Sequence, residues 1–271
     1  MDEIRNIAKS ADAPMSARML ILDLLDTGDP PSFSAAELVR AGAAFGIEAP
    51  GIRTALTRLK AEGRVRTLAR GRYTIGARAE PLKARILGWR TRLDSRREWD
   101  GRWLLAFAGP QERADRTAWR RTLRALELEG FAEAEVNLWV RPNNLDGGAP
   151  GLRDRLALLD AARSLLVVEA GGLDRDREDR FRRLWDGAGL SAAHEQLGTM
   201  LERSAGRIDT MPIEAAAAET LTLRRQAIRS IMRDPLLPEA LCATGSLARL
   251  IAAMTGYDRI GKTVWRDYLR G

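Results

Sequence analysis

The sequence predicts a mainly α-helical protein that contains one small α+β or α/β domain. Three observations lead to this fold class. Residues 17–63 carry three apolar or amphipathic stretches with helix start and stop residues, and most of the stretches in residues 174–271 have helical spacing. Between these regions, residues 99–173 alternate apolar strand-like runs with helical stretches. That alternation is typical of helices packed on a small sheet.

Three helices are predicted near the N-terminus. Ser16 can cap the first, over residues 17–26, and the capping box Ser34–Glu37 begins the second. Gly46 breaks the second helix, and Pro50 suits the first turn of the third. These three helices lie within about 50 residues, a length that favours one small helical core.

The third helix has one apolar face and one face of hydrogen-bond donors. The apolar face has the i, i+3, i+4, i+7 spacing of a buried stripe, at Ile52, Ala55, Leu56 and Leu59. The other faces carry Arg53, Thr54, Thr57, Arg58 and Lys60. Two β-prone runs follow, Arg64 to Leu68 and Tyr73 to Ile75, joined at Arg70-Gly71-Arg72, where Gly71 permits a tight hairpin.

Three helices followed by a hairpin is the order of a winged helix-turn-helix domain, which binds DNA. Between Arg53 and Arg72 the only acid is Glu62, so this stretch is strongly cationic. We predict DNA contacts by a helix in the major groove and by the hairpin, at Arg53, Thr54, Thr57, Arg58, Lys60, Arg70 and Arg72. The alternative is an ordinary solvated amphipathic helix with a hairpin.

Composition supports a polyanionic partner and excludes several kinds of site. The 271 residues contain 44 Lys and Arg against 37 Asp and Glu, a formal net charge of +7. Cys242 and His194 are the single cysteine and histidine, so no intrachain disulfide and no Cys-based or multi-His metal site is expected. No signal peptide or membrane-length apolar run is visible, so we expect a cytoplasmic protein without a cofactor.

The middle of the chain predicts a connector helix and three strands. The connector is an amphipathic helix over Leu82–Arg96. Strands are predicted at Trp103–Ala108, at Val136–Pro142 with a half-buried alternation, and at Leu165–Val168. Helices are predicted at Arg113–Glu129 and Leu152–Arg163. Farther on, Pro212 opens a long helix that ends before Asp234-Pro235, and its Arg225, Arg229 and Arg233 form one cationic stripe.

Several motifs, in order and across nearly the whole chain, resemble the PaaX family of bacterial transcriptional repressors. They are IRTALTRL, GRY, WDGRW, LRALELEGF leading into LWVRP, and RSIMRDPLLPEAL. The resemblance implies a winged-helix domain at residues 1–78, a connector helix at 79–98, a ferredoxin-like domain at 99–173 and a helical effector and dimerisation domain at 174–271. A ferredoxin-like fold has four strands, one more than the three predicted here.

The resemblance also implies a homodimer that binds an operator with an inverted repeat. An aryl- or acyl-CoA, such as phenylacetyl-CoA, would release it from double-stranded DNA. The phosphates of such an effector need cations, and Arg225, Arg229 and Arg233 are one available set. The alternative is that these arginines pair with nearby acids. A second regulator hypothesis is a winged-helix protein that answers to a different small ligand or to a partner protein, without binding acyl-CoA.

A nucleic-acid enzyme is the third hypothesis, because the middle domain of the PaaX family is similar to a small CRISPR-associated endoribonuclease. Metal-dependent cleavage of that kind needs an acid at the end of the first strand. Here the strand ends Ala106-Phe107-Ala108-Gly109, and Asp100 lies at its beginning. Neither Gly147-Gly148 nor Gly171-Gly172 has the spacing of a phosphate-binding loop. We therefore expect no enzyme.

Overall fold

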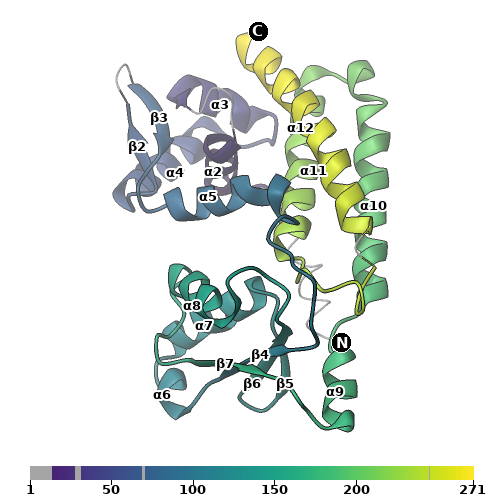
Figure 1. The fold of residues 1–271 in the computed structure, drawn as a ribbon. Coiled ribbons are helices and arrows are strands. Elements are labelled where there is room, and N and C mark those ends of the chain that lie inside the picture. The colour runs from purple at the N-terminus through teal and green to yellow at the C-terminus, as the bar shows by residue number, and fades with distance from the viewer. Residues whose placement is uncertain (1–13, 28–31, 69–70, 244) are drawn as a thin grey trace. The chain divides into compact units, whose positions relative to one another are not determined.

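The computed structural model describes residues 14–27, 32–68, 71–243 and 245–271 (Figure 1). The chain divides into two compact units. The first consists of Met1–Trp89, Leu197–Ile228 and Ala252–Gly271, and the second of Arg90–Gln196 and Arg229–Ile251. Most described residues are helical, and the strands form small antiparallel sheets. Among the described helices, none combines the length and the apolar character needed to cross a membrane.

Three short helices begin the first unit, as the local sequence predicts. They are α2 (Ala17–Thr27), α3 (Ala35–Ala43) and α4 (Ala49–Ala61). The Ser16 hydroxyl accepts a hydrogen bond from the Met19 amide at 3.2 Å. The capping box of α3 is complete, because Ser34 Oγ accepts from the Glu37 amide at 3.1 Å and the Glu37 carboxylate accepts from the Ser34 amide at 2.6 Å.

A three-stranded sheet, with order β1-β3-β2, completes this part of the first unit. The strands are β1 (Phe33–Ser34), β2 (Val65–Thr67) and β3 (Arg72–Ile75), and both pairings are antiparallel. Gly63 at the end of α4 and Gly71 before β3 both have φ of +69°, which glycine adopts without steric cost. The predicted order of three helices and a hairpin is therefore present.

The core of the first unit joins these helices to the C-terminal ones. Leu20, Leu38 and Ile52 pack in one cluster with Leu221 and Trp265. The latter two belong to α11 (Ile213–Arg233) and α12 (Gly245–Arg270). Helix α10 (Gly187–Ala205) and the 3₁₀ turn at Ile208–Thr210 precede them.

The predicted connector helix is shorter than expected. Helix α5 covers Glu80–Leu87, and a 3₁₀ turn over Gly88–Thr91 replaces its continuation to Arg96. Gly88 weakens an α-helix, and the neighbouring Trp89 is fully buried. Burial of this one large side chain fixes the local path of the chain, although the helical spacing extends farther.

The second unit contains a four-stranded antiparallel sheet. Its strands and helices run in the order β4 (Trp103–Phe107), α6 (Pro110–Arg113), α7 (Arg116–Leu128), β5 (Ala132–Glu135), β6 (Leu138–Pro142), α8 (Gly148–Leu158) and β7 (Leu166–Ala170). The sheet order is β5-β6-β4-β7. Helices α7 and α8 cover one face (Figure 1), and Phe181 of α9 (Arg175–Arg182) packs in a second cluster on the other.

The sheet corrects two predictions from the sequence. The sheet has four strands rather than the three predicted, because β5 was missed. Val136, the predicted start of the next strand, lies in the turn after β5 and is 82% exposed. The next strand is not half-buried either: all five residues of β6 are buried. Trp139 packs with the helices on one face, while Leu138 and Val140 pack on the other.

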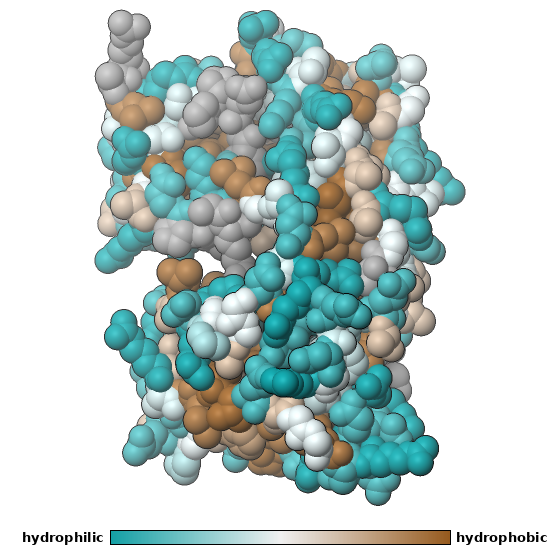
Figure 2. Space-filling view, in the orientation of Figure 1, coloured by the Kyte–Doolittle hydropathy of each residue, from teal (hydrophilic) through white to brown (hydrophobic). Residues whose placement is uncertain are grey.

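The surface of the second unit is not uniformly polar. Hydrophilic side chains dominate the face drawn in Figure 2, and hydrophobic ones gather in patches, one of them over the sheet near α6. Phe107 and Leu166 face each other across β4 and β7, and they are 38% and 55% exposed.

Candidate nucleic-acid interface

The solvent-facing side of α4 carries five hydrogen-bond donors. Ile52, Leu56 and Leu59 are buried in the core of the first unit, which fixes the rotation of the helix. The side chains on the remaining faces are exposed: Arg53, Thr54, Thr57, Arg58 and Lys60. The predicted division into an apolar and a cationic face is therefore present.

The one acid of this stretch is neutralised from another helix. Arg18 of α2 donates to both carboxylate oxygens of Glu62, at 2.8 and 2.7 Å, and Arg64 Nε lies 3.6 Å away. The hydrogen bond from Arg18 is the main cause that lowers the pKa of Glu62. Glu62 is therefore ionised and occupied by two arginines, so it leaves the α4 cations to an external anion.

Two of the α4 side chains have partners within the first unit. The Thr57 hydroxyl donates to the Arg53 carbonyl at 3.0 Å, which leaves its oxygen lone pairs as acceptors. The Lys60 ammonium lies 5.8 Å from the centre of the Tyr73 ring on the hairpin. This cation–π contact places Lys60 beside β3.

The hairpin cations are placed differently from one another. Arg70 lies outside the described residues. Arg72 is half-buried: its Nε donates to Ser32 Oγ at 3.0 Å, its guanidinium also donates to the Ser32 carbonyl, and Nη1 lies 3.3 Å from Glu37. This clamp, which we call the Arg72 clamp, joins the start of β3 to the capping box of α3. Sequence reasoning missed it, although a capping-box glutamate always has oxygen lone pairs to spare.

Arg66 is a further exposed cation of the hairpin that was not among the predicted contacts. It lies on β2, opposite Thr74 of β3. The alternation of side chains along a strand gives the signal, because Val65 is buried and Arg66 must then face the other way.

This region is similar to a known protein family. A family model described as PaaX-like protein matches residues 16–78. Residues 16–78 are therefore similar to that family, and we call them the PaaX-like domain. The whole chain is also similar to a solved structure, that of an uncharacterized protein, Rv0674 from Mycobacterium tuberculosis, with a TM-score of 0.62 and 24% sequence identity. That similarity covers 93% of this chain and 98% of the other and shows the fold alone. No curated protein matches the chain.

Outside the PaaX-like domain, the three arginines predicted to hold an effector are divided between the two units. Arg225 lies in the first unit and pairs with Asp23 of α2. Burial raises the pKa of Asp23, and Arg225 counteracts this. Arg229 and Arg233 belong to the second unit and are half-buried. The alternative reading, pairing with a nearby acid, is observed at Arg225, and the effector role of the three stays a prediction.

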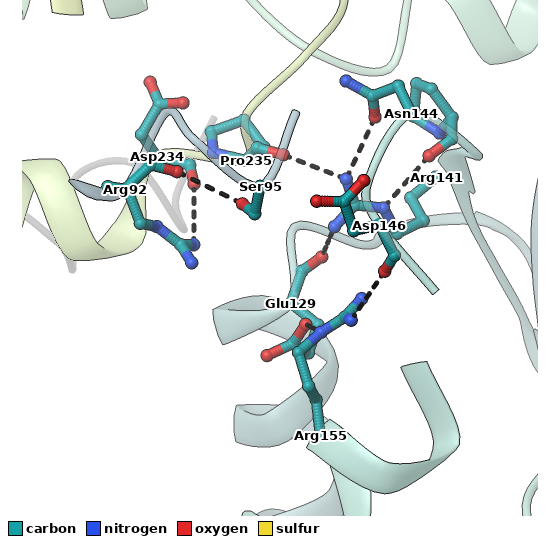
Figure 3. Close-up of polar contacts among 10 residues, drawn as sticks. Arg92, Ser95, Glu129, Arg141, Asn144, Asp146, Arg155, Asp234 and Pro235 are labelled. Carbon is teal, nitrogen blue, oxygen red and sulfur yellow. Dashed lines mark hydrogen bonds and ion pairs between the residues drawn. The ribbon is translucent and has the colours of Figure 1, made fainter. Parts of the chain in front are cut away.

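The RDPLLPE segment (residues 233–239) is held in the second unit by a buried arginine (Figure 3). Arg141 of β6 is 1% exposed and donates to the carbonyls of Glu129 and Pro142, to Asn144 Oδ1 and to the Pro235 carbonyl. Burial lowers the pKa of Arg141 to about 9. Asn144 Nδ2 also donates to Leu236 at 2.7 Å. We call this set the Arg141 network.

The described residues offer little for metal-dependent chemistry. Within those ranges, no group of three or more His, Cys, Asp and Glu side chains could hold a metal ion. Asp100, the acid nearest the start of β4, accepts from the Arg102 amide at 3.1 Å and pairs with the Arg102 guanidinium at 3.4 Å. His194 is buried between Asp234 and Ser246, and burial lowers its pKa.

Proposed function

We propose that the protein is a DNA-binding transcriptional regulator whose PaaX-like domain acts as a winged helix. The observation that carries this proposal is the solvent-facing side of α4, where five donors are exposed and the one neighbouring acid is occupied by Arg18. A helix of 13 residues is about 20 Å long, and its diameter fits a major groove about 12 Å wide. The match to a PaaX-like model favours a regulator over an enzyme.

The α4 side chains divide into two roles. Arg53 and Arg58, with Thr54 and Thr57, would touch base edges, because guanidinium groups pair bidentately with guanine and hydroxyl groups are versatile donors and acceptors. Lys60, Arg70 and Arg72 would hold phosphates, and exposed Arg66 joins them. Arg72 is the weakest of these contacts, because Glu37 already neutralises its charge.

The quaternary arrangement and the effector follow from the same proposal. A two-fold dimer would bind an inverted repeat with half-sites about 34–36 Å apart, or a multiple of that distance. We propose that it represses an operon and that an aryl- or acyl-CoA, such as phenylacetyl-CoA, releases it. A reversal of occupancy from 99:1 to 1:99 needs about 5.5 kcal/mol of differential affinity between the two conformations. The second candidate is the same winged-helix regulator with a different ligand or a protein partner. The second unit, with β5-β6-β4-β7 order, would serve as its ferredoxin-like domain.

A mobility-shift assay on DNA upstream of the gene tests these functions. The protein should retard a specific fragment, and a panel of acyl-CoAs should include one that releases it. Retention of the complex with every acyl-CoA would favour the second candidate. Absence of any specific shift would overturn the DNA-binding proposal, and cleavage of the fragment would replace it with an enzyme.

A further inference from the structure

The first unit contains a cavity beside α12 with a volume of about 440 Å³. Its described lining comes from the PaaX-like domain on one side and from α11 and α12 on the other. We call it the α12 pocket and define it by Phe33, Arg72, Leu221, Arg224, Gly261 and Trp265. A volume of this size is typical of pockets that bind small organic molecules.

Trp265, one of the residues of the apolar wall of the α12 pocket, carries an unsatisfied donor. The wall's side chains Phe33, Leu221 and Trp265 are each less than a tenth exposed. The indole Nε1–H of Trp265 is buried and has no hydrogen-bond partner among the described residues. An indole nitrogen can only donate, and a buried donor without an acceptor carries a free-energy penalty. A ligand oxygen that reaches this nitrogen from the pocket would remove that penalty.

The polar wall of the α12 pocket has an excess of positive charge. The described lining includes five cations and two acids, namely Arg72, Arg224, Lys262, Arg266 and Arg270 against Glu37 and Asp258. Arg224 Nε lies 2.7 Å from Asp258 Oδ1, and Lys262 Nζ lies 3.2 Å from Oδ2. Burial raises the pKa of Asp258, but the two cations together lower it by more, so the net pKa is below its usual value and the carboxylate is ionised. The described lining therefore carries three more cations than acids, and such a charge balance suits an anionic ligand.

We propose that the α12 pocket binds an amphipathic organic anion. Its apolar body would lie against Phe33, Leu221 and Trp265, one oxygen would accept from Trp265 Nε1, and a carboxylate or phosphate would meet the cations. A free carboxylic acid and a phosphate-bearing thioester share this chemistry. The inference rests on the proposed function, because it gives the place where an effector of the regulator acts.

The same pocket reaches the Arg72 clamp. Arg72 and Glu37 both line it, and their ion pair of 3.3 Å holds the start of β3 against α3. An anion in the pocket competes with Glu37 for the guanidinium of Arg72, and this competition alters how the hairpin is held. The hairpin carries proposed phosphate contacts, so the ligand changes DNA affinity. By linkage, DNA changes the affinity for the ligand by the same factor.

Calorimetric titration of the full chain with phenylacetate, with phenylacetyl-CoA and with CoA tests the site. Gly261→Leu fills the pocket from α12, where a Cβ would make ordinary contact with Thr220 at 3.5 Å. Gly256→Leu is the matched control, because it lies on the same helix, is exposed, and has nothing within 4 Å of its Cβ position. We expect wild type and Gly256→Leu to bind at least one probe, and Gly261→Leu to bind it at least about tenfold more weakly.

Trp265→Phe keeps an aromatic wall and removes the donor, so it should weaken binding about three- to tenfold. It also keeps the test decisive if Gly261→Leu fails to fold, which thermal unfolding reveals. Binding of phenylacetate would show that a free carboxylic acid is sufficient as the ligand. Binding of phenylacetyl-CoA alone would point to the thioester, and binding of CoA alone would point to the phosphates. Each of these results supports the site if the pocket variants weaken the binding. Binding of none of the probes, or equal binding by all variants, overturns the site.

A parallel mobility-shift assay separates this inference from the proposed function. DNA binding that persists while the ligand result is negative overturns the α12 pocket and leaves the DNA-binding proposal standing. Ligand binding that the pocket variants weaken, without any DNA binding, supports the pocket and overturns the proposed function. If both hold, the bound ligand must change DNA affinity in wild type and in Gly256→Leu, and an unchanged affinity overturns the coupling through the Arg72 clamp.

Discussion

Replacing Arg141 with alanine should lower the free energy of unfolding of the second unit by about 3–5 kcal/mol. The guanidinium donates to four acceptors on buried residues, three of them backbone carbonyls, and the farthest of these, Pro235, lies 94 residues along the chain from Arg141. Each acceptor left unpaired costs about 1–3 kcal/mol, and the carbonyls keep a second lone pair, so the lower part of that range applies to each. The variant no longer buries the Arg141 charge, whose desolvation lowers the pKa of the guanidinium, and this gain limits the total loss of stability.

Urea denaturation followed by far-UV circular dichroism and tryptophan fluorescence measures this loss. With a slope of about 2 kcal/mol per molar urea, the midpoint should fall by about 2 M. Arg120→Ala is the control, because Arg120 is an exposed residue of α7 in the same unit and should change stability by less than about 0.5 kcal/mol. A loss for Arg141→Ala that equals that of the control would refute the claim that the Arg141 network docks the RDPLLPE segment.

Three further predictions concern stability and charge. Burial and the neighbouring Asp23 raise the pKa of Asp26 from 3.8 to about 6, against the opposing effects of Lys83 and Arg224. The folded state therefore favours the protonated Asp26 carboxyl, and this contribution to stability is complete below pH 4 and is lost as the pH rises through 6. Asp26→Asn should therefore stabilise the protein at pH 8 by about 1–3 kcal/mol and by less at pH 5, and a gain independent of pH in thermal unfolding would contradict this. Gly130→Ala should lower the free energy of unfolding by about 2–4 kcal/mol in chemical denaturation, because φ is +78° and a Cβ would lie 2.7 Å from the Pro235 carbonyl oxygen. Gly172→Ala is the control: φ is +66° but the space is open, so it should cost about 1–2 kcal/mol. Equal costs for the two variants would show that the Pro235 contact is unimportant. Arg18→Ala should weaken DNA binding in a filter-binding assay, because it leaves the negative charge of Glu62 uncompensated beside α4. Adding Glu62→Gln to Arg18→Ala should restore binding, and no recovery in this double variant would exclude the electrostatic role of Arg18.

The first unit could be predicted from the sequence largely because its signals are local. The capping box at Ser34, Pro50 in the first turn of α4, and the glycines at positions 63 and 71 each act within a few residues. The exposed donors of α4 follow from the period of its apolar residues. The Arg72 clamp could not be predicted, because it depends on where the hairpin meets the start of α3.

The second unit shows where local reasoning fails. The four residues of β5 alternate alanine and glutamate, which are poor strand formers, and only pairing with β6 makes them a strand. Arg141 falls at an alternating position that a half-buried strand would expose, yet its partners at Pro235 and Glu129 bury it. In the same way, residues 245–270 form one uninterrupted helix, α12, although the segment contains Gly256 and Gly261. Tertiary contacts override propensity in each case.

The salt dependence and sequence preference of DNA binding by Arg53→Ala and Lys60→Ala test the central claim most directly. Both side chains are exposed on α4, but they are assigned to a base edge and to a phosphate. Arg53→Ala should lose about 1–3 kcal/mol of discrimination between the preferred and a mismatched sequence. Lys60→Ala should weaken binding to both sequences alike and reduce the slope of log K against log salt by about 0.9. Equal losses on both sequences from the two variants, or no loss from either, would contradict the placement of α4 in a major groove.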